Sequence, residues 1–216
     1  MLEALSKALS ILYIQSVSLF TNQQYFFKFI FMRALLIVDL QNDFLPAGSL
    51  GVKEGDKIIP TINSLMDSFP IIIASKDWHP EGSVHFDYWP VHCVANTEGA
   101  AFPDSLDSNK IQDIFYKGTD NKDDGYSAFE ATNKNLTQYL SDKKVEELYV
   151  VGIATDYCVK ASVIDALNEE IKTYIITDAI KAVNQTPGDD LKALEELEGK
   201  GAILISSHEL LKHASA

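Results

Sequence analysis

Short apolar runs recur along the chain, each about the length of one β-strand. Runs that are rich in β-branched residues and lack alternating polar positions are typical of strands buried on both faces of a parallel sheet. Strands are predicted over Ala34–Val38, Pro70–Ser75, Ile111–Tyr116, Leu148–Ile153, Ile171–Thr177 and Ala202–Ile205. The third of these runs is less apolar, but its residues alternate enough to indicate a strand.

Between these runs the apolar residues recur at helical spacing. The helix predicted over Gly55–Phe69 tolerates Pro60 only near its start, because proline lacks the N–H that a helix interior needs. Further helices are predicted over Asn133–Leu140, from Thr155 to about Glu170, near Asp189–Leu197 and from about Ser207.

The alternation of strand and helix predicts an α/β fold. Parallel strands need right-handed crossover connections, so we expect a three-layer sandwich, with helices on both faces of a six-stranded, mostly parallel, Rossmann-like sheet. In such sheets ligands bind outside the carboxyl ends of the strands. The functional residues are therefore expected at that edge.

Reactive side chains follow four of the predicted strands. Asp39 ends the first strand, Asp77 and His79 follow the second, Lys117 follows the third, and Cys158 lies just beyond the fourth. Chance would scatter such residues over the molecule. Their shared position predicts an active site at one edge of the sheet.

Cys158 is predicted to lie in the first turn of its helix, with Thr155 as the N-cap. Unpaired backbone N–H groups and the helix dipole favour a thiolate there. A lone cysteine after a strand is more often a small buried residue, but the other strand-end residues favour a reactive one. Cys93 has no partner base at a strand end and is expected to be a buried neutral thiol.

A candidate metal site is formed by Asp77, His79 and His92. One carboxylate and two imidazoles could bind an ion and leave positions open for water or substrate. Asp-x-His alone is a weak signal, since a surface histidine near an aspartate is the commoner explanation. Three of the chain's five histidines nevertheless fall in this loop. His85 is expected to be structural or to support the site from outside the ligand set.

Composition narrows the class of protein. A chain of 216 residues with 46% hydrophobic content can bury one substantial core. The formal net charge of −13 argues against nucleic acid or an anionic membrane as partner and suits a small-molecule substrate. Two cysteines imply no disulfide framework, so the cytoplasm is the expected compartment. The sequence leaves open a homo-oligomer.

Residues 1–31 differ in composition from the rest of the chain. They are rich in large apolar residues, but their apolar run is too short and too interrupted for a membrane-spanning helix. They also lack the basic start and the cleavage site of a secretory signal. We expect an extension outside a catalytic domain that spans residues 32–216, and a true start at Met32 would explain it.

Six short motifs occur in order over roughly Arg33 to Leu211. They are Val38–Phe44, Asp77–Pro80, Trp89–Cys93, Lys117–Asp120, Tyr126–Phe129 and Gly152–Val159. Together they resemble the nicotinamidases (pyrazinamidases) of the isochorismatase-like cysteine hydrolase superfamily. The Asp, Lys and Cys positions mark the superfamily, whereas the histidines and the Tyr-Ser-x-Phe loop point to the nicotinamidases.

The resemblance implies a catalytic triad of Asp39, Lys117 and Cys158. Lys117 and the helix terminus would lower the pKa of the thiol, and Asp39 would accept its proton. The thiolate would attack the carboxamide carbon. The backbone N–H groups of Ala154 and Cys158 would hold the oxyanion, in an arrangement that accompanies a cis peptide bond between Ile153 and Ala154.

The same resemblance implies one divalent ion, with Zn²⁺ the first choice and Fe²⁺ or Mn²⁺ as alternatives. Asp77, His79 and His92 would hold it, and its open position would orient the substrate ring. Phe44 and Trp89 would pack against that ring, although either aromatic could equally belong to the core. Tyr157 is expected to be structural.

The implied reaction converts nicotinamide to nicotinate and ammonia for NAD salvage, with pyrazinamide as an analogue substrate. Two alternatives stay open at this point. The first is another amidase of the superfamily that acts on carbamoyl or ureido compounds, and the second is a non-catalytic metal-binding or thiol-sensing module. Isochorismatase activity is disfavoured because that branch generally lacks this cysteine and metal set.

Overall fold

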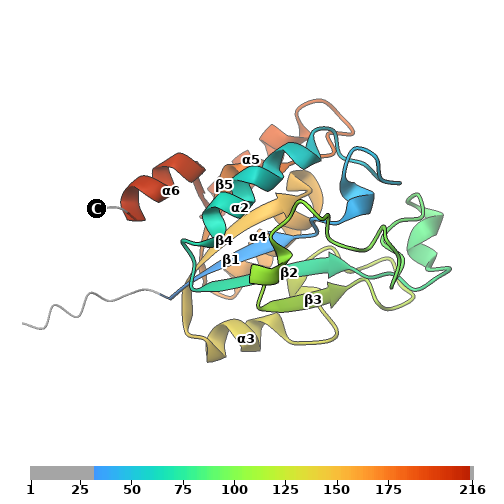
Figure 1. The fold of residues 1–216 in the computed structure, drawn as a ribbon, viewed down its shortest axis with the longest axis horizontal. Helices are drawn as coiled ribbons and strands as arrows, with labels where there is room; N and C mark the ends of the chain where they lie inside the picture. The colour runs from blue at the N-terminus through green and yellow to red at the C-terminus, as the bar shows by residue number, and fades with distance from the viewer. Residues whose placement is uncertain (1–31, 215–216) are drawn as a thin grey trace, which may run out of the picture. The chain divides into compact units, whose positions relative to one another are not determined.

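A computed structural model describes residues 32–214, so the prediction for residues 1–31 lies outside the part described. Six strands form one sheet in the order β3-β2-β1-β4-β5-β6, and every neighbouring pair is parallel (Figure 1). The predicted α/β class and the predicted six strands are confirmed.

All six strands occur close to their predicted positions. Their bounds are β1 (Met32–Val38), β2 (Ile71–Asp77), β3 (Asp113–Lys117), β4 (Val145–Ile153), β5 (Lys172–Lys181) and β6 (Ile203–Ile205). The main difference is β5, which continues beyond the predicted Thr177. An irregularity in its register with β4, between Val150 and Gly152, lets the later part of β5 pair with the end of β4.

The helices also lie near their predicted positions. They are α2 (Ile59–Met66), α3 (Leu136–Asp142), α4 (Lys160–Asn168), α5 (Asp189–Gly199) and α6 (Ser207–Ala214), and a 3-10 turn over Gly55–Ile58 precedes α2. Pro60 lies in the first turn of α2, as predicted. Within residues 32–214 no helix has both the length and the apolar character needed to cross a membrane.

The turn that carries Cys158 differs from the prediction. A π turn over Thr155–Val159 precedes α4, and Ala154 rather than Thr155 occupies the cap position, without a side-chain cap hydrogen bond. The Ala154 carbonyl accepts from the N–H groups of Tyr157 and Val159, both at 3.0 Å. The predicted Thr155 cap is therefore wrong, because this wider turn already includes Thr155.

Side chains of alternating residues on each strand face two separate apolar layers. On β1, Leu35 and Ile37 pack with residues of α2 and α6, whereas Leu36 and Val38 pack with residues of α3, α4 and α5. In Figure 1 α2 and α3 accordingly lie on opposite sides of the sheet. The central strands are therefore buried on both faces.

The four neighbouring strands β3, β2, β1 and β4 bring the reactive residues to one edge. Asp77 and Lys117 are the last residues of β2 and β3 and are paired in register. Asp39 follows β1, and Cys158 lies in the turn after β4. The expected convergence at the carboxyl edge of the sheet follows directly from this strand order.

Gly152 lies where the end of β4 meets β1. Its φ is +114°, and an added Cβ would collide with the backbone of Val38. Gly188 also has a positive φ, +92°, but has open space around it. Substitutions at these two glycines can therefore distinguish the cost of backbone strain from the cost of steric collision.

Gly152→Ala should lower the free energy of unfolding by about 3 kcal/mol, from strain plus overpacking. Gly188→Ala, which adds strain alone, should cost about 1 kcal/mol. Urea denaturation followed by circular dichroism measures both. Equal losses for the two variants would mean that the approach of Gly152 to β1 does not constrain the fold.

Candidate active site

The structure brings Asp39, Lys117 and Cys158 into contact. Lys117 Nζ lies 2.7 Å from Asp39 Oδ2 and 3.5 Å from Cys158 Sγ. All three side chains are buried. Ser75 donates a hydrogen bond of 2.7 Å to the other oxygen of Asp39 and so fixes the orientation of that carboxylate.

Lys117 also contacts two groups outside this trio. Its ammonium donates to Asp77 Oδ1 and to the carbonyl of Gly125, the latter at 2.8 Å. Burial would lower the pKa of Lys117, but the carboxylates of Asp39 and Asp77 raise it well above its usual range. Burial likewise opposes ionisation of Asp77, yet Lys117 holds the pKa of that carboxyl well below its usual range. The pair of Lys117 and Asp77 is therefore charged.

The thiol of Cys158 does not have the lowered pKa expected from the sequence. Burial raises the pKa of Cys158 well above its usual range, and Lys117 only partly opposes this. Burial also raises the pKa of Asp39, which makes it a stronger base than an ordinary carboxylate. The resting sulfur is therefore a thiol beside a base.

A cavity opens beside the sulfur of Cys158. Ala154 lines it together with both predicted aromatic residues, Phe44 and Trp89. The peptide bond between Ile153 and Ala154 is cis, as the resemblance implied. The residues predicted for the nucleophile, the oxyanion donors and the ring-packing walls thus share one cavity.

Two tyrosines belong to the same cavity wall. Trp89 stands edge-on to Tyr157, with ring centroids 5.3 Å apart, and its Nε1 donates a hydrogen bond of 3.1 Å to the hydroxyl of Tyr126. Tyr157 was expected to be structural, yet it lines the cavity. Its position directly before Cys158 indicates that Tyr157 lies near the site, but the sequence does not show which way its ring points.

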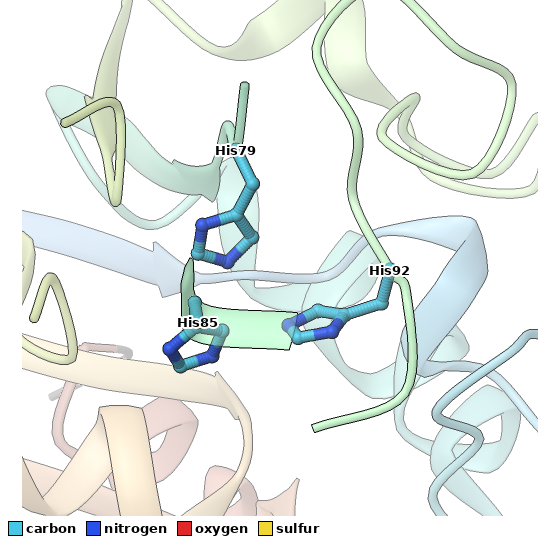
Figure 2. A group of neighbouring side chains, drawn as sticks. All are labelled: His79, His85 and His92. Atoms are coloured by element: carbon cyan, nitrogen blue, oxygen red, sulfur yellow. The ribbon is translucent and has the colours of Figure 1, made fainter. Parts of the chain in front are cut away.

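Three histidines that line the same cavity gather in one cluster (Figure 2). Ring nitrogens of His79, His85 and His92 lie within 4.8 Å of one another, and all three side chains are buried. Asp77 Oδ2 lies 3.7 Å from Nε2 of His79 and 3.7 Å from Nε2 of His92. The described residues therefore include a group that could hold a metal ion.

One observation favours a cation over a purely structural cluster. Nε2 of His79 is buried and has no hydrogen-bond partner. Buried polar atoms in native proteins are nearly always paired, and an unpaired imidazole nitrogen beside a carboxylate matches the donor set of Zn²⁺ and similar ions. The residues present thus fit a divalent ion.

His85 was expected to lie outside the ligand set, but the structure groups its ring with those of His79 and His92. A 3-10 turn over Val84–Asp87 returns His85 toward the other two rings, and Ser83 caps that turn by accepting from the backbone N–H of His85 at 3.2 Å. This turn, rather than any strand, positions His85. The position of His85 in the site therefore cannot be predicted from the strand ends.

Polar side chains after β1 hold the two site loops in place. Gln41 accepts from the backbone N–H of Asp77 and donates to its carbonyl, both at 2.8 Å. Asp43 accepts from the backbone N–H of Cys93 at 2.7 Å. Cys93 itself is fully buried, and burial raises the pKa of its thiol well above the usual range, in agreement with the neutral thiol predicted.

Known proteins of one family are similar to this chain. A model of the isochorismatase domain matches residues 33–209. The chain is 39% identical to the nicotinamidase of Escherichia coli (strain K12), and the match covers 80% of this chain and 93% of that protein. The chain belongs to the isochorismatase domain family.

Two solved structures add detail. The pyrazinamidase of Pyrococcus horikoshii in complex with zinc is 38% identical, with a TM-score of 0.72, and the match covers 81% of this chain and 99% of that one. The L. infantum protein PnC1 in complex with nicotinate is 31% identical, with a TM-score of 0.77, and the match covers 83% and 94%. Both share the fold described above.

Replacing Lys117 by Met should abolish activity and lower the free energy of unfolding by about 3 kcal/mol, because two buried carboxylates lose their counter-ion. Lys122→Met is the matched control, since Lys122 lies in the loop after β3 and is exposed. Denaturant unfolding and an amidase assay measure both effects. Unchanged stability of the Lys117 variant would contradict the buried ion network.

Proposed function

We propose that this protein hydrolyses nicotinamide to nicotinate and ammonia in NAD salvage, through a thioester on Cys158, and that it also deamidates pyrazinamide. The observation that carries the proposal is the contact of Lys117 Nζ with both Asp39 and Cys158 beside the cavity. Membership of the isochorismatase domain family, with a nicotinamidase as a relative, supports the choice of substrate.

In the first half of the reaction Cys158 Sγ attacks the carboxamide carbon. Asp39 takes the thiol proton, while Lys117 stays charged between the two groups. The developing oxyanion is held by the backbone N–H groups of Ala154 and Cys158, two residues that line the cavity. Loss of one such donor typically slows turnover by about 100-fold to 1000-fold.

In the second half the C–N bond breaks. Asp39 returns its proton to the leaving nitrogen, the tetrahedral intermediate collapses, and ammonia departs, which leaves a thioester on Cys158. Asp39 then takes a proton from a water molecule that attacks the thioester carbon. The C–S bond then breaks, Asp39 gives its proton to the sulfur and so restores the thiol of Cys158, and the acid leaves as nicotinate after losing its proton to solvent.

The metal site that we propose consists of Asp77, His79 and His92, and the position of the His85 ring beside the other two supports it as a further ligand. A divalent ion held there, with Zn²⁺ the first choice and Fe²⁺ or Mn²⁺ as alternatives, would orient the substrate ring through its open coordination positions. The unpaired Nε2 of His79 supports this assignment. Trp89 and Phe44 would pack against the ring.

We also propose a class of partner, a compartment and a domain boundary for the chain. Because the chain has a net charge of −13, we expect a small molecule, rather than nucleic acid or a membrane, as the partner. We place the protein in the cytoplasm and residues 1–31 outside the hydrolase domain of residues 32–216.

Cys158→Ala should abolish ammonia release from nicotinamide, because the variant has no nucleophile. Cys93→Ala is the matched control and should keep most of the activity, since Cys93 lies outside the proposed machinery. A coupled ammonia assay measures both, and mass spectrometry of the acid-quenched wild type should show an acyl adduct on Cys158. Ammonia release by the Cys158 variant, or faster turnover of ureido substrates by the wild type, would contradict the proposal.

Replacing His79 or His92 by Ala should lower the bound metal well below one ion per chain, because each change removes one ligand. His208→Ala is the control, since His208 is an exposed residue of α6. Elemental analysis after dialysis against a chelator and reloading gives the stoichiometry. Full metal content in both active-site variants would exclude these residues as ligands.

A further inference from the structure

Each of the three clustered histidines has its Nδ1 atom beside an oxygen. Nδ1 of His79 lies 3.0 Å from the carbonyl of Gly118, and Nδ1 of His92 lies 2.7 Å from the carbonyl of Pro90. Nδ1 of His85 lies 2.8 Å from Asp123 Oδ1.

These oxygens fix the tautomer of each imidazole. A carbonyl or a carboxylate oxygen can only accept, so each Nδ1 must carry the hydrogen. The lone pair then resides on Nε2 of every ring. The cluster in Figure 2 therefore has three imidazoles that each keep Nε2 available as a ligand atom.

The support of His85 differs from the other two. His79 and His92 are oriented by backbone carbonyls, whereas His85 is oriented by the side chain of Asp123. The side chain of His85 is 6% exposed and that of Asp123 is 40% exposed. A carboxylate at the surface thus holds a histidine in the interior.

Asp123 and His85 come from different connections of the fold. His85 lies after β2, and Asp123 lies in the loop after β3, whose residue Gly125 accepts from Lys117. A second contact joins the same segments, since Asn121 Oδ1 accepts from the backbone N–H of Val84 at 2.8 Å. The loop therefore has an attachment that does not depend on Asp123.

We infer that Asp123 is a positioning residue for the metal site, which holds the His85 ring so that Nε2 points into the cluster. The inference rests on the proposed metal site and adds a residue that does not touch the ion. Carboxylates that accept from the second nitrogen of a metal-binding histidine fix its orientation and raise its basicity, and their removal typically lowers metal affinity by about 10-fold to 100-fold.

The test measures Zn²⁺ affinity directly. Metal-stripped wild type, Asp123→Ala, Asp123→Asn and Asp120→Ala compete with a chromophoric chelator for Zn²⁺. Asp123→Ala should weaken binding by about 10-fold to 100-fold. The Zn²⁺ affinity of Asp123→Asn should lie between those of Asp123→Ala and the wild type, because the amide oxygen of Asn can still accept from Nδ1 of His85. Asp120 is exposed in the same loop, so its variant should match the wild type.

A double variant separates orientation of His85 from attachment of the loop. In a His85→Ala background Asp123→Ala should cause no further loss of Zn²⁺ affinity, because the ring it orients is gone. The visible absorption of bound Co²⁺ should change in Asp123→Ala and not in Asp120→Ala. Thermal unfolding of the stripped proteins should be alike, since Asp123 is partly exposed.

Three results would overturn the inference. The Zn²⁺ affinity of Asp123→Ala could lie within twofold of that of the wild type. Alternatively, the Asp123→Ala change could lower the affinity as much in the His85→Ala background as in the wild type. The first result excludes any role toward the ion, and the second assigns Asp123 to the loop alone. A wild type that binds no Zn²⁺ would instead reject the proposed metal site itself, and the inference with it.

Discussion

One buried ammonium group holds the site together. Lys117 is fully buried and contacts the carboxylates of Asp39 and Asp77. Burial of an ion costs several kcal/mol unless it is paired, and removal of one partner leaves the others uncompensated. Two carboxylates and one ammonium leave one excess negative charge in the interior. A divalent cation beside Asp77 would offset it, so the chemistry of the triad and that of the metal site are linked by charge.

Asp77 directly connects the triad with the proposed metal site. Its Oδ1 accepts from Lys117, while its Oδ2 faces His79 and His92. The register of β2 with β3 places Asp77 beside Lys117, so the sheet itself sets the distance between the two halves of the site. A shift of one residue in that pairing would turn one of these side chains to the opposite face. The fold and the site therefore depend on the same register.

The residues at the carboxyl edge of the sheet can be predicted from the sequence because buried parallel strands appear as apolar runs and their carboxyl ends lie at one edge. Asp39, Lys117 and Cys158 were found for that reason. His85 was missed because a 3-10 turn, rather than a strand, returns it to the site. The pKa of Cys158 was predicted in the wrong direction, because the sequence shows the nearby lysine but not the burial of the sulfur. Turn geometry and solvent access depend on packing that no local pattern records.

The neutral thiol at rest is compatible with a thiolate mechanism. Burial raises the pKa of Cys158 and also that of Asp39, so the free energy of moving a proton from sulfur to carboxylate depends on the difference between two values shifted in the same direction. The transfer leaves the total charge of the site unchanged. Lys117 contacts both groups and can stabilise the negative charge on either one. The proton can therefore pass between Cys158 and Asp39 at lower cost than the raised pKa of the thiol alone implies.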